Sequence, residues 1–107
     1  MTFEEPKIME DRKADLHMHT VASDGTDTLE ERIKDAEKKG LDIIAITDHD
    51  TINEKLDRRA FTAENGVKVI TGAEIKCEIK GEKIEILAYF IDPEGDDIQR
   101  LLTDLSK

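Results

Sequence analysis

The residues with the clearest chemical meaning are the three histidines of the chain, which all fall in two short segments rich in carboxylates. His17 and His19 lie in the motif DLHMHT (residues 15–20), and His49 lies in TDHDT (residues 47–51). Residues two apart on an extended segment leave the same face, so the first two imidazoles can converge on one ion or on neighbouring ions. Neutral imidazole and carboxylate are ligands that zinc and first-row divalent metals accept. The sequence therefore predicts a metal site.

The second motif follows an apolar run that has the character of a buried strand. The run IIAI (residues 43–46) leads into Thr47, which is expected to place Asp48, His49 and Asp50 just beyond the carboxyl end of the strand. Parallel sheets and barrels place their sites at that edge. A lone histidine is more often an ordinary core or surface residue, but three histidines clustered in two His/Asp motifs favour the metal site.

Composition limits the classes of function. The chain has 107 residues, of which 37% are hydrophobic, 4% aromatic and 39% charged, so we expect one soluble domain with an aliphatic core. The formal net charge of -10 argues against long duplex nucleic acid as a partner, because that contact depends on basic residues. A phosphate held through bound metal ions remains compatible with this charge.

The cellular compartment is inferred from cysteine usage and hydropathy. Cys77 is the only cysteine, which excludes an intrachain disulfide and fits a reducing compartment. The longest apolar stretch, residues 86–91, is too short to cross a bilayer, and the acidic N-terminus lacks the apolar core of a signal peptide. We therefore expect a cytoplasmic protein with no membrane contact.

The first elements follow from hydrophobic periodicity and capping signals. Residues 1–12 are charged and are expected to form a leader or flexible tail, followed by one domain over residues 13–107. A strand is predicted over residues 14–18. A capping-box pattern, Thr28 to Glu31, then opens a helix that ends at Gly40; its inner stripe is apolar and consists of Leu29, Ile33 and Ala36.

The remaining elements complete a predicted βαβαββα order of the α/β class. A second strand over residues 42–47 precedes a helix over residues 53–65, whose buried face is made of Leu56, Ala60 and Ala63. Two β-rich runs, residues 68–78 and 83–90, are joined by KGE and indicate a hairpin or a loosely connected pair of strands. The last element is a short amphipathic helix that covers a core or a partner; its apolar residues are Ile98, Leu101, Leu102 and Leu105.

Four segments, in this order and at this spacing, resemble a known family. They are residues 15–20 (DLHMHT), 22–26 (ASDGT), 46–51 (ITDHDT) and 72–75 (GAEI). The chain is similar, from about residue 14 to residue 93, to the N-terminal part of the PHP (polymerase and histidinol phosphatase) domain. The ending ILAYFIDP (residues 86–93) resembles the small metal-dependent phosphoesterase branch of that family.

The resemblance implies a fold and a set of metal ligands. It implies part of a PHP-type distorted (β/α) barrel of seven parallel-type strands, with up to three divalent ions, zinc, manganese or iron, at the carboxyl edge. His17, His19 and Glu74 would hold one ion, Glu74 would bridge to a second, and Asp24 with His49 would contribute to a third. The same comparison marks His17, His19, His49 and Asp24 as catalytic residues.

The resemblance also implies roles for the other acids of the motifs and for the reaction. Asp15, Asp48 and Asp50 would orient imidazoles or stabilise turns. The implied activity is the hydrolysis of a phosphate ester in a small phosphoester or nucleotide substrate.

The chain departs from the family pattern in two places. Glu85 stands where similar sequences have a histidine, and it is either a harder metal ligand or a strand residue that faces solvent. The family's later histidine motif and its final Asp-x-His are absent, because the chain ends at Lys107. The resemblance therefore covers less than half of a full domain.

A partial barrel leaves alternatives for assembly and function. An unpaired sheet edge favours a homo-oligomer or a complementing chain, unless residues 96–107 fold back over the open face as a lid. The principal hypothesis is a PHP-type phosphoesterase; the alternative is a shortened or split domain that binds metal as an accessory module without activity on its own. A remnant without metal is disfavoured, because the acids gathered at one edge would repel one another.

Overall fold

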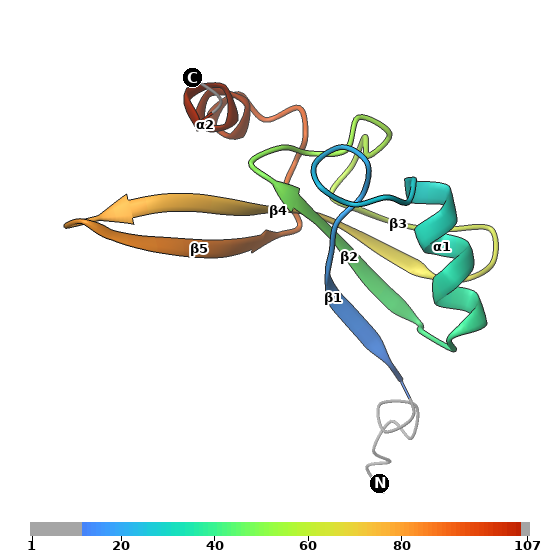
Figure 1. Cartoon of the computed structure of the whole chain (residues 1–107). Coiled ribbons are helices and arrows are strands. Elements are labelled where there is room, and N and C mark those ends of the chain that lie inside the picture. Colours follow the sequence, from blue (N-terminus) through green and yellow to red (C-terminus); the bar gives the residue numbers. More distant parts are fainter. Residues whose placement is uncertain (1–11, 106–107) are drawn as a thin grey trace, which may run out of the picture.

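The computed structural model describes residues 12–105, which form one mixed sheet with two helices (Figure 1). The elements follow the order β1 (Ala14–Met18), α1 (Leu29–Lys38), β2 (Ile43–His49), β3 (Ala60–Thr62), β4 (Lys68–Ile79), β5 (Glu82–Tyr89) and α2 (Asp96–Leu105). The α/β class is confirmed. The predicted leader, apart from Arg12, lies outside the described residues.

The sheet brings the carboxyl ends of three strands to one edge. β1, β2 and β4 are parallel neighbours in that order, whereas β3 and β5 both run antiparallel to β4. β2 pairs with β4 from Ile43 opposite Lys68 to His49 opposite Glu74. The last pair therefore places a histidine of one motif beside the glutamate of another.

The two faces of the sheet have different partners. Residues that alternate along β2 and β4 form a helix face, where Ile44, Ile46 and Val69 are fully buried in a core with Leu29 and Ala36 of α1. The other face, which we call the open face, carries Thr47 and His49 of β2 and Gly72 and Glu74 of β4.

The C-terminal helix packs on the helix face. Ala73 and Ile75, which alternate with the open-face residues of β4, form a second apolar cluster with Ile91, and Ile98 of α2 packs against this cluster. α2 therefore lies on the same face as the first core cluster and not on the face that carries the ligands. Neither described helix is long and apolar enough to span a membrane.

α1 begins where the sequence predicts it. The Thr28 hydroxyl accepts a hydrogen bond from the Glu31 backbone N–H at 3.2 Å, and the Glu31 carboxylate accepts one from the Thr28 N–H at 3.0 Å. Gly40 follows the helix with φ +71°, a left-handed conformation that glycine adopts without strain. This helix carries no candidate ligand, but it covers the core on which the strands of the site rest.

Replacing Thr28 with alanine is expected to lower the free energy of unfolding by about 1 kcal/mol, because the substitution removes the side-chain partner of one helix N–H. Urea denaturation monitored by circular dichroism measures the change. The matched control is Thr26→Ala, at an exposed position just before the helix, for which a change within about 0.5 kcal/mol is expected. Equal effects of the two substitutions would contradict the capping role.

The predicted helix over residues 53–65 is wrong. This segment forms a loop and the short strand β3, which pairs with the first residues of β4 from Ala60 opposite Ile70 to Thr62 opposite Lys68. Its backbone and side chains bond to distant residues rather than within a helix: the Asn53 amide donates to Thr20 Oγ1 at 2.9 Å. Leu56 is buried as expected, but Ala60 is exposed. Tertiary pairing with an open strand edge outweighs the local helical pattern.

The other strand predictions are confirmed, with one shift at the site. β4 and β5 form the expected hairpin, and the two turn residues, Lys80 and Gly81, have φ of 51° and 82°. β2 ends at His49 rather than at the predicted residue 47. His49 is therefore the last residue of a strand instead of part of the turn that follows it.

Candidate metal centre

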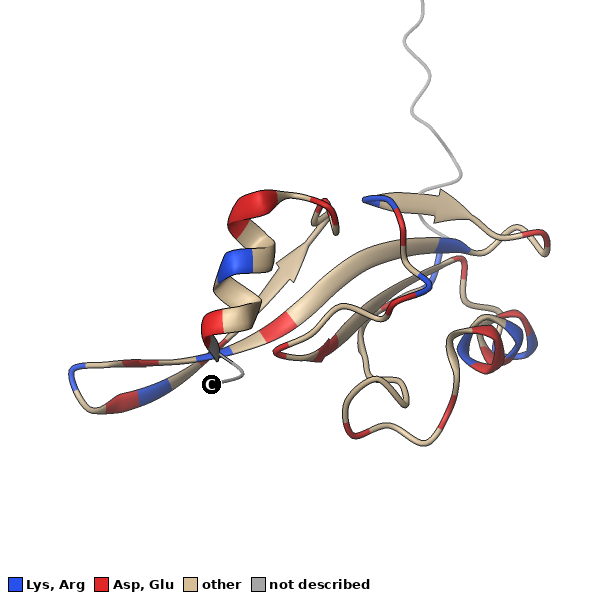
Figure 2. Ribbon diagram, turned by 90° about the horizontal axis from the view of Figure 1, so that it is seen from above, with Lys and Arg blue, Asp and Glu red and all other residues tan. Residues whose placement is uncertain are grey.

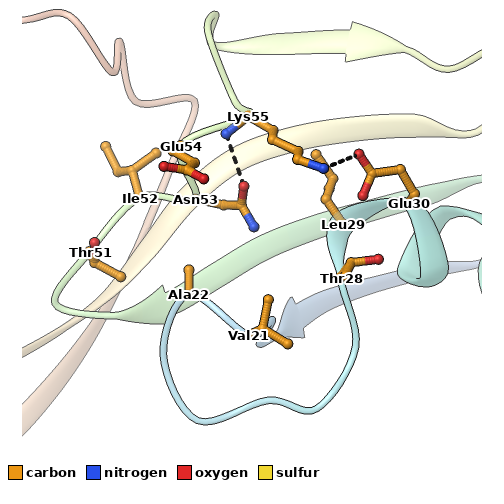
Figure 3. Close-up of a pocket in the computed structure, with 10 residues that line it drawn as sticks. All are labelled: Val21, Ala22, Thr28, Leu29, Glu30, Thr51, Ile52, Asn53, Glu54 and Lys55. Carbon is orange, nitrogen blue, oxygen red and sulfur yellow. Dashed lines mark hydrogen bonds and ion pairs between the residues drawn. The ribbon is translucent and has the colours of Figure 1, made fainter.

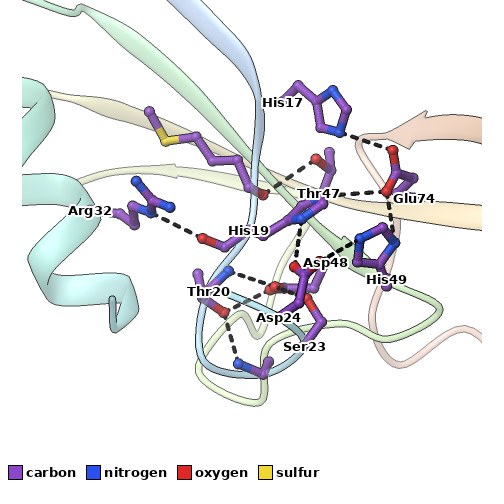
Figure 4. Close-up of polar contacts among 12 residues, drawn as sticks. His17, His19, Thr20, Ser23, Asp24, Arg32, Thr47, Asp48, His49 and Glu74 are labelled. Atoms are coloured by element: carbon purple, nitrogen blue, oxygen red, sulfur yellow. Dashed lines mark hydrogen bonds and ion pairs between the residues drawn. The ribbon is translucent and has the colours of Figure 1, made fainter. Parts of the chain in front are cut away.

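All five candidate ligands meet at the carboxyl edge of the sheet (Figure 4). His17 lies on β1, and His19 follows that strand directly. Asp24 lies on the loop before α1, His49 ends β2, and Glu74 lies on β4. The structure thus brings together all four sequence segments, three of them through strands that are neighbours in the sheet and one through the loop before α1.

Glu74 is the buried centre of the cluster. Its Oε1 lies 2.9 Å from His17 Nε2, and its Oε2 lies 2.7 Å from His49 Nδ1 and 3.3 Å from His19 Nε2. The side chain is only 4% exposed, whereas that of His17 is 51% exposed. One carboxylate therefore contacts every imidazole of the chain, and the cluster is open to solvent on the His17 side.

Asp24 closes a ring on the solvent side. Its Oδ1 lies 2.7 Å from His19 Nδ1, and its Oδ2 lies 2.9 Å from His49 Nε2. Glu74 contacts the same two imidazoles from the buried side, so two carboxylates and two imidazoles alternate in a ring. Desolvation raises the pKa of Asp24, but the hydrogen bonds and electrostatic interactions with the His19 and His49 imidazoles outweigh it and hold this pKa below its usual value.

Three buried atoms of this ring have no hydrogen-bond partner among the described residues: His19 Nε2, His49 Nδ1 and Glu74 Oε2. They lie at ion-pair distance, yet no N–H of the imidazoles is directed at the carboxylate. Buried polar atoms left in this way are costly unless another group satisfies them. A divalent cation does so, and ligand atoms within 4.8 Å of one another occur in two groups: His17, His19 and Glu74, and His19, Asp24 and His49. The donor set fits the metals that the sequence implies.

The contact between His19 and Asp24 fixes one tautomer. When Nδ1–H of His19 donates to Asp24 at 2.7 Å, Nε2 carries the free lone pair and faces Glu74. A carboxylate behind a metal-binding imidazole is a common arrangement that orients the ring and raises its basicity. His19 therefore belongs to both groups by position, although one neutral imidazole offers a single lone pair.

Asp48 anchors the loop that carries the ligands, and the expectation that it orients an imidazole is not supported by its contacts. Its buried carboxylate accepts from the Thr20 N–H at 2.6 Å, the Thr20 hydroxyl at 2.7 Å and the Ser23 hydroxyl at 2.6 Å. Thr20 follows His19, and Ser23 precedes Asp24. The carboxylate therefore fixes the loop between two ligands.

The other two motif acids also bind backbone groups. Asp15 accepts from the His17 N–H at 3.1 Å, and Asp50 accepts from the Lys76 N–H at 3.0 Å. These contacts of Asp15 and Asp50 agree with a role in stabilising the backbone rather than in orienting an imidazole. Arg32, which no sequence motif marked, donates from Nε to the His19 carbonyl at 3.0 Å. Arg32 lies within a predicted helix, and nothing in the sequence around it indicates a contact with the His19 carbonyl.

Glu85 lies outside both ligand groups. It is an exposed residue of β5, opposite Lys76 in the antiparallel pairing with β4. Of the two alternatives for this position, the structure shows the strand residue that faces solvent.

Two cavities border the loops of the centre. A cavity of about 380 Å³ opens beside the ligands and is lined by Asp15, His17, Met18, His19, Asp24, Gly25 and Arg32. A second cavity of about 430 Å³ lies between the loop after His19, the start of α1 and the loop after His49 (Figure 3). An ion pair between Lys55 and Glu30, 2.7 Å apart, crosses it. The Lys55 ammonium lowers the pKa of Glu30.

A His and carboxylate centre at the carboxyl edge of an α/β sheet defines a class of metal-dependent enzymes and metal-binding domains. A family model described as the PHP domain matches residues 15–103. The chain belongs to the PHP domain family, and the resemblance seen in its motifs is confirmed.

Relatives with known names agree with this family. The chain is 34% identical over 91 residues to a 5'-3' exoribonuclease of Haemophilus influenzae, a match that covers 85% of the chain and 33% of the relative. It is 34% identical over 80 residues to a phosphoribosyl 1,2-cyclic phosphate 1,2-diphosphodiesterase of Eggerthella lenta, covering 73% and 30% respectively. The chain thus spans about a third of the length of these relatives.

A solved structure contains the same fold within a longer chain. An amidohydrolase from Chromobacterium violaceum, with bound sulfate and no metal, superimposes with a TM-score of 0.76 at 28% identity. The match covers 86% of this chain and 32% of that one. The fold is therefore part of a larger barrel architecture.

Proposed function

We propose that this chain takes part in metal-dependent hydrolysis of phosphate esters, as a PHP-type phosphoesterase. The observation that carries the proposal is the ring of Glu74, His19, Asp24 and His49, whose buried atoms lack hydrogen-bond partners and converge as ligands do. The names of the relatives, an exoribonuclease and a cyclic phosphate diphosphodiesterase, support the same reaction class.

Each ligand has a distinct part in this proposal. His17, His19 and Glu74 hold one ion, and Asp24 with His49 contributes to another. Glu74 would contribute to both ions, because its Oε1 contacts His17 and its Oε2 contacts His49. The ionised carboxylate of Asp24 adds negative charge for the cations and holds the His19 ring in place.

The reaction needs a nucleophile and stabilisation of charge on the phosphoryl oxygens. Divalent ions in such sites supply both, by lowering the pKa of water and by polarising the phosphoryl group. His17 and Asp24, as the most exposed ligands, lie where a substrate phosphate enters from solvent. We assign catalytic roles to His17, His19, His49 and Asp24 in holding and orienting the reacting groups.

The substrate proposed is a small phosphoester or a nucleotide. Figure 2 shows acidic and basic segments interspersed along the ribbon, and the net charge of -10 disfavours a long duplex. Zinc, manganese and iron are the proposed ions. The single Cys77 favours a reducing compartment, so we propose a cytoplasmic location.

Metal content and hydrolysis test the proposal together. The chain, purified without chelator and equilibrated with zinc or manganese, is expected to retain at least about one ion per chain by elemental analysis and to hydrolyse p-nitrophenyl phosphate or a nucleotide. The double variant His17→Ala/His19→Ala is expected to lose both properties. A matched control, Lys34→Ala on the exposed side of α1, keeps them. A ratio near zero in the wild-type chain would overturn the enzyme proposal for this chain alone.

Exposed apolar surface favours one second candidate, an accessory module that binds metal and acts only with a complementing chain or a second copy. On the strands, the large apolar side chains of Leu16, Ile79 and Ile86 are 42–53% exposed. Exposed apolar surface of this kind is typical of interfaces. Metal binding at normal stoichiometry without hydrolysis, in monomer and oligomer fractions alike, would favour the accessory module over the enzyme.

A further inference from the structure

Tyr89 makes a contact that the ligand geometry does not include. It is the last residue of β5, and its hydroxyl donates a hydrogen bond to the backbone carbonyl of Leu16 on β1 at 2.8 Å. The two residues are 73 positions apart in the sequence. Their strands are not neighbours, because β4 and β2 lie between them in the sheet. One side chain thus joins the two ends of a four-strand series.

This contact requires a strongly curved sheet. Neighbouring strands lie about 4.8 Å apart, so three steps from β5 to β1 measure roughly 14 Å along the sheet. That distance exceeds the reach of a tyrosine side chain with one hydrogen bond. The sheet therefore curls around its open face, and Tyr89 spans the curl as a chord.

Tyr89 lies on the same face as the ligands. It is directly opposite Gly72, which precedes Glu74 by two residues on β4, so all three share the open face. A Cβ atom at Gly72 would lie 2.5 Å from the Ala88 carbonyl oxygen and 3.0 Å from Thr47 Cγ2. Only glycine permits so close an approach of the strands here. The curvature of the sheet and the Tyr89–Leu16 hydrogen bond therefore lie next to the metal centre, about two residues before Glu74 along β4.

The Tyr89 hydroxyl contacts β1 at the point where the regular pairing of β1 with β2 is interrupted. The register of β1 on β2 shifts between Asp15 and Met18, so Leu16 and His17 have no regular partner on β2. The Tyr89 hydroxyl supplies a partner for the Leu16 carbonyl at this point. Since His17 follows Leu16 directly, the hydrogen bond fixes the segment from which the first ligand extends.

We infer that Tyr89 is a positioning residue of the metal centre. Its bond to Leu16 holds β1 at the separation from β4 at which the His17 and His19 imidazoles meet Glu74. The contact between His17 and Glu74, 2.9 Å long, joins β1 to β4, the strand with which β5 pairs. Holding the ligands in place before the ion binds removes an ordering cost from metal binding. The inference rests on the metal centre of the proposed function.

Tyr89→Phe tests the inference, because it keeps the ring and removes only the hydroxyl. Titration calorimetry with zinc or manganese is expected to show a dissociation constant about fivefold larger than that of the wild-type chain. This loss of affinity corresponds to the free energy of one hydrogen bond. Cobalt(II) loading is expected to give an altered visible spectrum, which reports on ligand geometry. The matched control is Thr71→Val, which removes a hydroxyl bond to the Arg58 carbonyl on the helix face. It is expected to lower the urea midpoint but to leave the dissociation constant and the spectrum unchanged.

A second measurement needs no substitution. Tyr89 is the only tyrosine of the chain, so growth with 3-fluorotyrosine labels this position alone. Its fluorine resonance is expected to shift when zinc is added to the wild-type chain, and not in His17→Ala/His19→Ala.

The outcomes separate the inference from the function on which it rests. If the wild-type chain binds no metal, the proposed function fails. If it binds metal and Tyr89→Phe has the same dissociation constant and cobalt spectrum, the positioning role alone is overturned. A fluorine resonance that does not move at saturating zinc has the same meaning.

Discussion

Glu74→Gln is expected to weaken divalent-metal binding by at least about a hundredfold, the largest effect of any single substitution at the centre. Among the residues that the structure describes, Glu74 alone contacts all three imidazoles, and its negative charge would balance the cations from the buried side. The amide keeps the size of the side chain but loses the charge and one acceptor. Titration calorimetry measures the dissociation constant directly.

The same variant is expected to separate metal binding from folding. In the wild-type chain, metal at a hundred times its dissociation constant stabilises the fold by about 2.7 kcal/mol, and Glu74→Gln is expected to lose most of this gain. The metal-free variant is expected to be no less stable than the metal-free wild type, because Glu74 Oε2 has no hydrogen-bond partner to lose. Urea denaturation with and without metal measures both quantities.

Glu78→Gln is the matched control, since Glu78 lies on the same strand but is exposed. We expect it to leave both the dissociation constant and the metal-linked stabilisation unchanged. Wild-type affinity in Glu74→Gln would show that the ion is held without this carboxylate, which would require a different set of ligands.

The candidate site was accessible from the sequence because its residue types are rare and its strands are regular. Three histidines in two motifs predict the imidazole ligands, and a buried apolar run predicts the strand over residues 42–47, which in the structure extends to His49. Parallel pairing of β2 with β4 then places His49 opposite Glu74. Spacing was thus enough to predict that the two histidine motifs form a metal site, whereas Asp24 and Glu74 were predicted from the family resemblance.

The contacts that hold the site could not be predicted, because they depend on tertiary geometry. The Leu56 and Ala60 pattern favours a helix, but the edge of β4 offers backbone partners that turn this segment into a loop and β3. Asp48 has the sequence context of an imidazole partner, yet it lies on the helix face and bonds to Thr20 and Ser23. The alternation of side chains along a strand determines which face a residue occupies. Its hydrogen-bond partner, in contrast, depends on which loop passes over that face in the folded chain.

Asp48→Asn is expected to lower the free energy of unfolding by about 3 kcal/mol, because a buried carboxylate that accepts three hydrogen bonds is replaced by a group with one acceptor. The three donors come from Thr20 and Ser23, and the new NH₂ group would face at least one of them. The loop then loses its anchor between His19 and Asp24. Metal affinity is therefore expected to fall together with stability, unlike in Glu74→Gln.

Asp42→Asn is the control for this substitution, because Asp42 is exposed and accepts one hydrogen bond, from the Lys13 N–H at 3.1 Å. Its effect on the free energy of unfolding is expected to stay within about 0.5 kcal/mol, with no change in metal affinity. Urea denaturation and metal titration of both variants test the contrast. Equal losses at the two positions would mean that Asp48 does not anchor the loop. A loss of stability at Asp48 with wild-type metal affinity would mean that the ligands are held by their own strands, and that the loop contributes little to the geometry of the centre.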